Sequence, residues 1–279
     1  MPNLKDWKPG DLIRALVYGR FKVGKTFGAG TFPRPNVIDL DGGLATLTNP
    51  DWVQKYGVPN VEYQTFSESD KTPQGVVRVA KAFDDACRYF DLWMKPGKRD
   101  QFDTWIVDSG TKLSAYAQNK AIMLMGDSAF TGPKVMSVTH KKAMERGMVF
   151  PKIQDYGAER SLVDQFVQML YDSGKNFLFL CHEKELTNND GATTAIVPLL
   201  TGRGVDEISL KFDEVWNLRV AKQGSGFNRL LQTQADGIRY CGSRIGVPDG
   251  TEWDYKTIVK ALEARYAETQ KLFNASKGV

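Results

Sequence analysis

The sequence has few residues of the kinds that build metal centres, disulfide frameworks or membrane spans. Its 279 residues include two histidines and three cysteines, and neither residue type recurs at a ligand-like spacing. Neither a zinc site nor a disulfide-stapled secreted fold is therefore expected. No apolar run approaches the roughly 18 residues that cross a bilayer, and the N-terminus lacks the apolar core of a signal peptide. We expect a cytoplasmic protein that does not contact a membrane.

A strong excess of one charge is also missing. Lys and Arg number 37 against 33 for Asp and Glu, which gives a net charge of +4. Dedicated nucleic-acid binders usually carry a stronger basic bias, so a nucleic-acid partner has to be argued from local clusters. No repeat or Pro/Gly/Ser-rich linker divides the chain. We therefore predict one domain over residues 1–279, with a core at about 12–250 and a C-terminal helix at 255–273.

Short apolar runs alternate with helical patterns along the chain. The runs that predict buried strands are 13–18, 36–41, 104–108 and 176–181. Apolar spacings of three and four predict helices at 74–94, 161–172 and 255–273. Residues 213–220 and 229–233 are typical of a hairpin, and the glycines, prolines and asparagines of 126–157 and 183–207 indicate long irregular loops. This order favours an α/β fold, with a mostly parallel sheet covered on both faces by helices and an antiparallel hairpin at its edge.

The first buried strand leads into a glycine-lysine motif, G-x-x-x-x-G-K-T, at residues 19–26. Its glycines allow consecutive backbone N–H groups to curl around phosphate oxygens, and the following helix adds its positive end. Lys25 would reach the β- and γ-phosphates, and the Thr26 hydroxyl would bind Mg²⁺. The predicted nucleotide-binding residues are Gly19, Arg20, Phe21, Lys22, Val23, Gly24, Lys25, Thr26 and Phe27. Arg20 and Lys22 replace the middle glycine, and either could contact a phosphate or face a neighbouring subunit.

Acidic residues follow two other apolar strands. Asp108 ends the strand at 104–108, where ligands bind in open α/β sheets, and beside the glycine-lysine loop it would hold Mg²⁺ with Thr26. Asp39 and Asp41 share one face of the strand at 36–41, so Asp41 could orient an attacking water. The other interpretation of these two carboxylates is a hydrogen-bonded Asp-Gly turn.

His182 follows the apolar strand at 176–181 and is a candidate sensor of the γ-phosphate. A single histidine at a strand end can equally be a hydrogen-bonded structural residue, and both interpretations stay open.

The order of these parts resembles that of RecA-type ATPases. Residues 19–26 resemble a Walker A loop, Asp108 a Walker B acid, Asp41 the catalytic carboxylate and His182 the sensor, although Glu and Gln are more usual at the last two positions. Softer similarities at 154–157, 211–215 and 229–233 extend the resemblance to phage-encoded RecA-like ATP-binding proteins over about residues 12–250. The resemblance implies ATP and Mg²⁺ as cofactors and Arg244 as a finger acting on a neighbouring subunit.

The resemblance also implies partners. These are single-stranded DNA, a single-strand-annealing or single-stranded-DNA-binding protein, and further copies of the chain in a ring or filament, in a host cytoplasm if the chain is phage-encoded. The loops after Asp108 and His182 would face DNA. The candidate DNA contacts are Lys134, Lys141, Lys142, Lys184 and Arg203. A solvated charged surface at 134–146 is the alternative. Other possible functions are a different phosphate-loop motor or switch, such as a helicase loader or packaging ATPase, and a nucleotide-gated assembly protein with little turnover.

Overall fold

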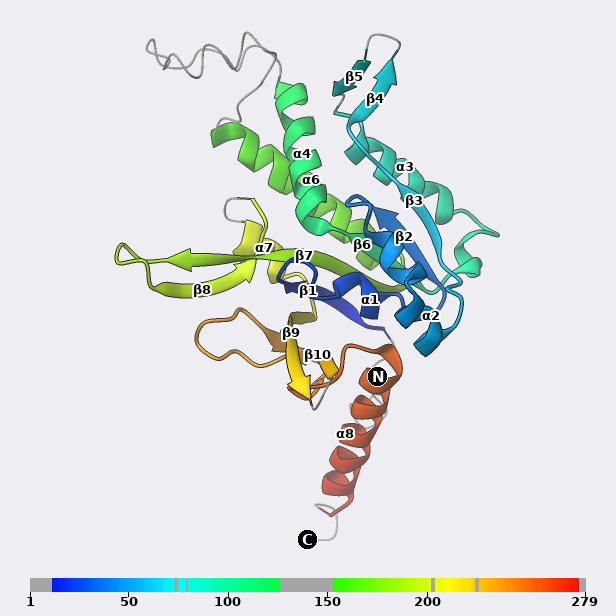
Figure 1. Cartoon of the computed structure of the whole chain (residues 1–279), viewed down its shortest axis with the longest axis vertical. Coiled ribbons are helices and arrows are strands. Elements are labelled where there is room, and N and C mark those ends of the chain that lie inside the picture. Colours follow the sequence, from blue (N-terminus) through cyan, green and yellow to red (C-terminus); the bar gives the residue numbers. More distant parts are fainter. Residues whose placement is uncertain are drawn as a thin grey trace.

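The computed structural model describes residues 12–72, 75–78, 80–125, 153–201, 204–223 and 226–275. A central sheet lies between helices (Figure 1). The strands are β1 (Arg14–Gly19), β2 (Pro35–Asp39), β3 (Glu62–Thr65), β4 (Ser69–Thr72), β5 (Gly75–Arg78), β6 (Thr104–Asp108), β7 (Asn176–Thr187), β8 (Thr193–Pro198), β9 (Glu214–Gln223), β10 (Gly226–Gln232) and β11 (Gly242–Ser243). The helices are α1 (Lys25–Ala29), α2 (Pro50–Tyr56), α3 (Ala82–Trp93), α4 (Gly110–Met125), α6 (Ile153–Asp172), α7 (Gly204–Ser209) and α8 (Tyr255–Ala275), with short 3₁₀ turns η1 (Gly43–Thr48) and η2 (Arg99–Gln101).

The main sheet has the strand order β10-β9-β1-β7-β6-β2-β3. All of its neighbouring strands from β9 to β3 pair in parallel, and β10 pairs antiparallel with β9. Two further strands, β8 and β11, add antiparallel pairs to β7 and β9. The predicted α/β fold class, a mostly parallel sheet between helices with an antiparallel hairpin at its edge, is therefore confirmed.

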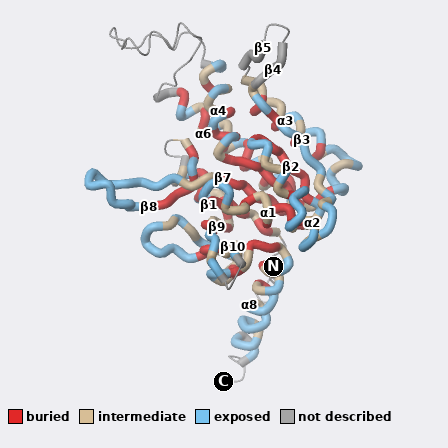
Figure 2. The backbone as a smooth tube through the Cα atoms, viewed as in Figure 1, coloured by how far each residue is buried: buried red, intermediate tan, exposed pale blue. Residues whose placement is uncertain are grey.

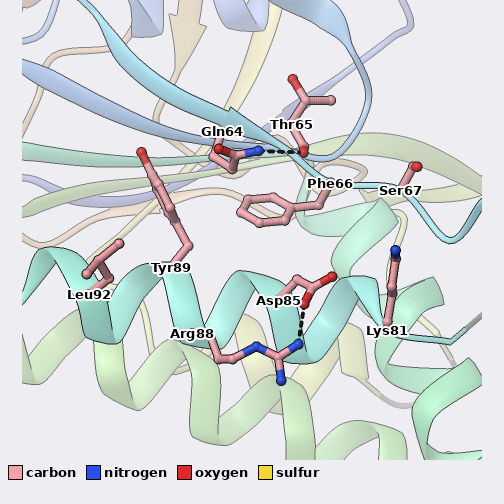
Figure 3. Close-up of a pocket in the computed structure, with 9 residues that line it drawn as sticks. All are labelled: Gln64, Thr65, Phe66, Ser67, Lys81, Asp85, Arg88, Tyr89 and Leu92. Carbon is pink, nitrogen blue, oxygen red and sulfur yellow. Dashed lines mark hydrogen bonds and ion pairs between the residues drawn. The ribbon is translucent and has the colours of Figure 1, made fainter. Parts of the chain in front are cut away.

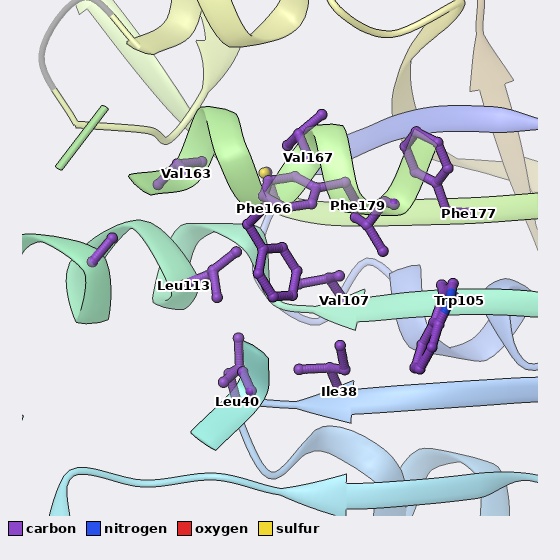
Figure 4. Packing of buried hydrophobic residues seen from close by; sticks show 14 of the residues in the cluster. Ile38, Leu40, Trp105, Val107, Leu113, Val163, Phe166, Val167, Phe177 and Phe179 are labelled. Atoms are coloured by element: carbon purple, nitrogen blue, oxygen red, sulfur yellow. The ribbon is translucent and has the colours of Figure 1, made fainter. Parts of the chain in front are cut away.

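Each face of the sheet carries its own apolar cluster, because successive strand residues point to opposite faces. Leu16 and Tyr18 of β1 belong to the cluster under α3, α4 and α6, in which Val107, Phe166 and Phe179 also pack (Figure 4). Residues of β1 that point to the other face, such as Ala15 and Val17, belong to a second cluster that includes Trp253 and the first turns of α8. Burial on both faces explains why the central strands read as nearly continuous apolar runs.

The predicted strands and hairpin are found close to their expected positions. The strand at 104–108 matches β6 residue for residue, and those at 13–18 and 36–41 differ from β1 and β2 by one or two residues at their ends. The C-terminal helix α8 ends two residues beyond its predicted end. The predicted domain limits stay a prediction.

Three predicted segments were wrong in extent. The helix expected at 74–94 begins only at Ala82, because Gly75–Arg78 pairs with β4 as a strand instead. The helix expected at 161–172 begins at Ile153, inside the segment predicted to be irregular, and the remainder of that segment lies outside the described residues. Residues 183–198 are not irregular either, because β7 continues to Thr187 and pairs with β8 around a turn at Asn188–Gly191. The β-branched run Thr193-Thr194-Ala195-Ile196-Val197 was the signal for β8.

Two elements extend beyond the layered body. The outer part of the β7–β8 hairpin and most of α8 are exposed, whereas the central strands are buried (Figure 2). Among the described residues, no helix combines the length and the apolar character needed to cross a membrane.

Candidate active site

The parallel register brings the ends of β1, β2 and β6 and the middle of β7 to one edge of the sheet. Gly19 of β1 pairs with His182 of β7, and Asp108 of β6 pairs with Asp39 of β2 and Leu180 of β7. The predicted phosphate loop, acidic residues and histidine therefore meet at the carboxyl edge, where ligands bind in open α/β sheets. A cavity of about 500 Å³ opens there. Its lining residues are Phe21, Lys22, Gly24, Lys25, Thr26, Phe27, Asp41, Gly42, Gly43, Thr46, Asp108, His182 and Arg229.

The loop after β1 turns sharply into α1. Lys22 and Gly24 both have a positive φ, of 61° and 98°, and the Val23 N–H donates to the Arg20 carbonyl over 3.3 Å. Glycine adopts the conformation at position 24 without strain, which explains its place in the motif. The Lys25 side chain is buried and its Nζ donates to the Gly19 and Arg20 carbonyls, each over 3.0 Å. Burial lowers the pKa of Lys25, and the charge of Asp108 opposes that shift.

Thr26 and Asp108 are in direct contact across the mouth of the loop. The Thr26 hydroxyl donates to Asp108 Oδ2 over 2.6 Å. Burial raises the pKa of Asp108 to about 6, and the hydrogen bond from Thr26 only partly offsets this effect. A buried carboxylate beside a hydroxyl supplies the hard oxygen ligands that Mg²⁺ prefers, so this pair fits a magnesium ion.

Asp41 lies beyond the end of β2 and faces His182. His182 Nε2 lies 3.3 Å from Asp41 Oδ2, within hydrogen-bond distance. Burial raises the pKa of Asp41, but hydrogen bonds from His182 and Ser109 outweigh it and hold the pKa below its ordinary value. Asp41 is therefore an ionised carboxylate at the edge of the cavity.

Asp39 and Asp41 do not share one face of a strand, so that prediction is corrected. The strand ends at Asp39, whose buried carboxylate accepts hydrogen bonds from the Gly42 N–H at 2.8 Å and the Thr65 hydroxyl at 2.9 Å. Asp39 makes the hydrogen-bonded turn that was one of the two interpretations, and this turn directs the following Asp41 into the cavity.

Arg229 is a cavity residue that sequence reasoning missed. It comes from the edge strand β10, and its guanidinium carbon lies 4.1 Å from the centre of the Phe27 ring. The segment 229–233 was recognised as a strand, but an arginine in an edge strand carries no signal of its own. A positive charge at the first residue of an apolar stretch was the one available cue, and only the folded sheet connects it to the loop.

Other predicted residues lie around this centre or away from it. Arg20 pairs with Glu183 at 3.1 Å and Glu185 at 3.2 Å, at the base of the β7–β8 hairpin. Phe21 is 74% exposed, with its ring centre 5.9 Å from that of His182. Val23 packs against the apolar cluster that contains Val17.

Arg244 lies far along the sheet from the loop within its own chain. It follows β11, which pairs with Glu214 and Val215 at the amino end of β9, and it forms an ion pair with Asp213 at 3.2 Å. Its action on a neighbouring subunit stays a prediction.

The predicted DNA contacts are mostly outside the described residues. Lys134, Lys141, Lys142 and Arg203 lie there, while Lys184 lies on β7. The loop expected after His182 is a hairpin instead, because β7 continues to Thr187 and pairs with β8. After Asp108 the chain forms α4, and residues 126–152 of the other expected loop lie outside the described residues. The β7–β8 hairpin from 183 to 198 carries three acids, Glu183, Glu185 and Asp190, against one lysine. Its charge does not favour a polyanion.

A second cavity of about 450 Å³ lies between the end of β3 and α3 (Figure 3). Three charged residues line it, Lys81, Asp85 and Arg88, and the last two pair with each other. None of the predicted site residues lines it. The cavity at the carboxyl edge is therefore the candidate active site.

The chain matches a protein-family model and is similar to a solved structure. Residues 12–244 match the protein-family model described as an AAA domain. The sequence matches no curated protein. Among solved structures, it is similar to a KaiC-like protein from the hyperthermophilic archaeon Pyrococcus horikoshii OT3. The two chains have 12% sequence identity and a TM-score of 0.40, and the match covers 83% of this chain and 84% of that one.

Proposed function

The chain belongs to the AAA domain family, and we propose that it binds ATP with Mg²⁺ and hydrolyses it to ADP and phosphate. One observation carries the proposal. The cavity that contains Lys25 also contains the Thr26–Asp108 pair and the Asp41–His182 pair. Phosphate binding, metal binding and water activation need these three groups within one site.

The loop would hold the phosphates. Its backbone curls at Lys22 and Gly24, and Lys25 would exchange its two carbonyl acceptors for phosphate oxygens. Thr26 and Asp108 would hold Mg²⁺, which neutralises charge on the phosphates when bound.

Asp41 would act on the attacking water. As an ionised carboxylate at the cavity edge it can accept a proton or a hydrogen bond from water, and His182 fixes its orientation through the 3.3 Å contact. His182 belongs to β7, which continues into the exposed hairpin. It is therefore suited to relate the state of the site to that hairpin, as a sensor would.

An ATPase assay with the Lys25→Ala variant tests the proposal. We expect the wild type to hydrolyse ATP in the presence of Mg²⁺, and the variant to lose hydrolysis together with most of its ATP affinity. Lys95→Ala is a matched control, because Lys95 is exposed and does not line the cavity, so this variant should bind and hydrolyse ATP as the wild type does. Unchanged ATP affinity in Lys25→Ala would show that the loop does not bind a nucleotide.

The finer proposal is that the ATPase acts on single-stranded DNA in phage recombination or replication, as a homo-oligomer with an annealing or single-stranded-DNA-binding protein. Support comes from the sequence resemblance and from the basic cluster at 134–146. Titrating single-stranded DNA into the ATPase assay at two salt concentrations tests it. Stimulation that weakens at higher salt is expected, because phosphate contacts release counterions. An ATP hydrolysis rate that does not change with added DNA would instead favour a helicase loader, a packaging ATPase or another motor.

The short carboxylate at position 41 favours a second candidate, a nucleotide-gated assembly protein. Its contact with His182 at 3.3 Å leaves it less free to reach a water than an unpaired glutamate would be. Tight ATP binding with negligible hydrolysis would identify this alternative.

A further inference from the structure

Arg229 stands apart from the other charged residues of the candidate site. In the strand order, β6, β7 and β2 lie on one side of β1 and carry Asp108, His182 and the turn to Asp41. Arg229 comes from β10 on the other side of β1. The phosphate loop that follows β1 therefore lies between the carboxylates and this arginine.

The position of Arg229 is fixed by a contact shared with the loop. Trp253 donates its backbone N–H to the Arg229 carbonyl over 2.8 Å and its indole N–H to the Lys25 carbonyl over 2.9 Å. Trp253 is 1% exposed, and its ring occupies the space that a side chain at Gly28 would need. One buried residue thus ties the arginine strand to α1.

The Arg229 side chain extends over the loop itself. A Cβ atom at Gly24 would lie 2.1 Å from Arg229 Nε, so only glycine leaves room for the arginine there. The guanidinium group lies against the Phe27 ring. Gly24 and Phe27 flank the two residues, Lys25 and Thr26, that define the phosphate-binding motif.

One donor of the Arg229 guanidinium group, Nε, has no acceptor within the described residues. This Nε is buried, and within the described part of the chain no carboxylate forms an ion pair with the guanidinium. A cation held near a cavity with unmet donors is costly unless an anion completes it. Arginine, with its planar fork of N–H groups, is suited to phosphate oxygens.

From these contacts we infer that Arg229 is a nucleotide-binding residue that contacts the phosphate nearest the nucleoside. The inference rests on the proposed function, because it names the orientation of the nucleotide in that site. The carboxylates and His182 mark the end where the terminal phosphate and its metal belong. Arg229, on the opposite flank of the loop, marks the end that is common to ATP and ADP.

Calorimetric titration of the full-length protein with Mg²⁺ and either ADP or a non-hydrolysable ATP analogue tests this orientation. Arg229→Met keeps an unbranched apolar stem against Phe27 and removes the guanidinium. We expect it to weaken binding of both nucleotides by a similar factor, about tenfold to 100-fold, the usual range for a hydrogen bond to a charged group. Arg229→Lys keeps the charge without the fork and should bind both nucleotides with intermediate affinity.

Arg219→Ala is the matched control. This arginine lies on the neighbouring strand β9, pairs with Asp249 and does not line the cavity, so both affinities should stay at the wild-type value. Thermal melting without nucleotide verifies that each variant folds.

Two results would overturn the inference. Unchanged affinity for both nucleotides in folded Arg229→Met and Arg229→Lys would remove Arg229 from the site. A loss confined to the ATP analogue would place it on the terminal phosphate instead. Failure of the proposed function looks different, because the wild type would then bind neither nucleotide or Lys25→Ala would bind as well as the wild type.

Discussion

The two flanks of β1 are built from different chemistry. On the flank of β7, β6 and β2, polar residues gather at the carboxyl edge of the sheet, where Thr26 of α1 bonds to Asp108 of β6, and Asp41, which follows β2, contacts His182 of β7. On the flank of β9 and β10, the edge strands supply one cation, Arg229, which lies on an aromatic ring and has no acidic partner within the described residues.

The difference follows from how each flank is made. Parallel strands deliver their carboxyl ends to one edge, so polar residues at those ends meet without special loops. In the antiparallel hairpin, the middle of a strand lies nearest the site, so the side chain that reaches the site from there has to be long. The carboxylate flank is thus suited to metal and water chemistry, and the arginine flank to binding. The following predictions test this division, from the largest expected effect to the smallest.

Asp41→Asn should distinguish most clearly between a loss of turnover and a loss of nucleotide affinity. Removing the carboxylate should lower ATP turnover by about 10²-fold to 10⁴-fold, the usual contribution of general base catalysis, with little change in nucleotide affinity. Steady-state hydrolysis and nucleotide titration measure the two quantities. Asp51→Asn, at an exposed position in the first turn of α2, is the control. A matching loss of affinity in Asp41→Asn would contradict the division between chemistry and binding.

Gly24→Ala should disturb both the loop and the arginine flank. The alanine has to adopt a φ near 98°, which costs about 1–3 kcal/mol in a sparsely populated region, and its methyl group would also displace Arg229. Chemical unfolding should show a lower unfolding free energy, and nucleotide titration should show a lower affinity.

Gly42→Ala is the matched control for that variant. Gly42 has a positive φ of 71° but open space around it, so its alanine experiences backbone strain without a clash. Adding Arg229→Met should restore part of the unfolding free energy that Gly24→Ala loses, because the clash is removed. It should restore none of the unfolding free energy that Gly42→Ala loses. Equal behaviour of the two alanines in both backgrounds would rule out a contact between Arg229 and the loop.

Asp108→Asn should stabilise the protein in the absence of Mg²⁺ and nucleotide, although it removes a group proposed for turnover. The folded-state pKa of about 6 lies above the ordinary 3.8, so the folded protein binds an extra proton between these values. The stability from this group is present at low pH and is lost as the pH rises through about 6. Above pH 6, Asp108→Asn should gain at most about 3 kcal/mol in unfolding free energy, and near pH 4 the gain should vanish.

Urea unfolding at a series of pH values measures this effect. Asp41→Asn provides a control of opposite sign, because the pKa of Asp41 is lowered and its contribution is lost as the pH falls. A gain in Asp108→Asn that does not depend on pH would mean that burial of the ionised carboxylate is not its cause.

Arg20→Ala should have the smallest effect. Its pairs with Glu183 and Glu185 are at the surface, where the Arg20 side chain is 75% exposed, and such pairs contribute little to stability. We expect a melting temperature close to that of the wild type and unchanged ADP affinity. A large loss of ADP affinity would make Arg20 a second arginine of the binding flank, and would weaken the distinction drawn for Arg229.

The sequence by itself determined the carboxylate flank. The motif at 19–26 and the polar residues that end the apolar runs, Asp108 and His182, are local signals, because strand ends and sharp turns depend on residues that are adjacent in the chain. The parallel sheet then brings these ends together in any fold of this class, which is why Asp108 and Lys25 could be placed in one site from spacing alone.

Only the tertiary structure decided the remaining features. The β7–β8 hairpin replaced a predicted irregular loop because cross-strand pairing overrode the turn-forming residues around it. The separate roles of Asp39 and Asp41 depend on Thr65 from another strand. Arg229 reaches the phosphate loop because Trp253 bonds both to Arg229 and to Lys25, which lies 228 residues before Trp253 in the chain. No local pattern encodes this contact.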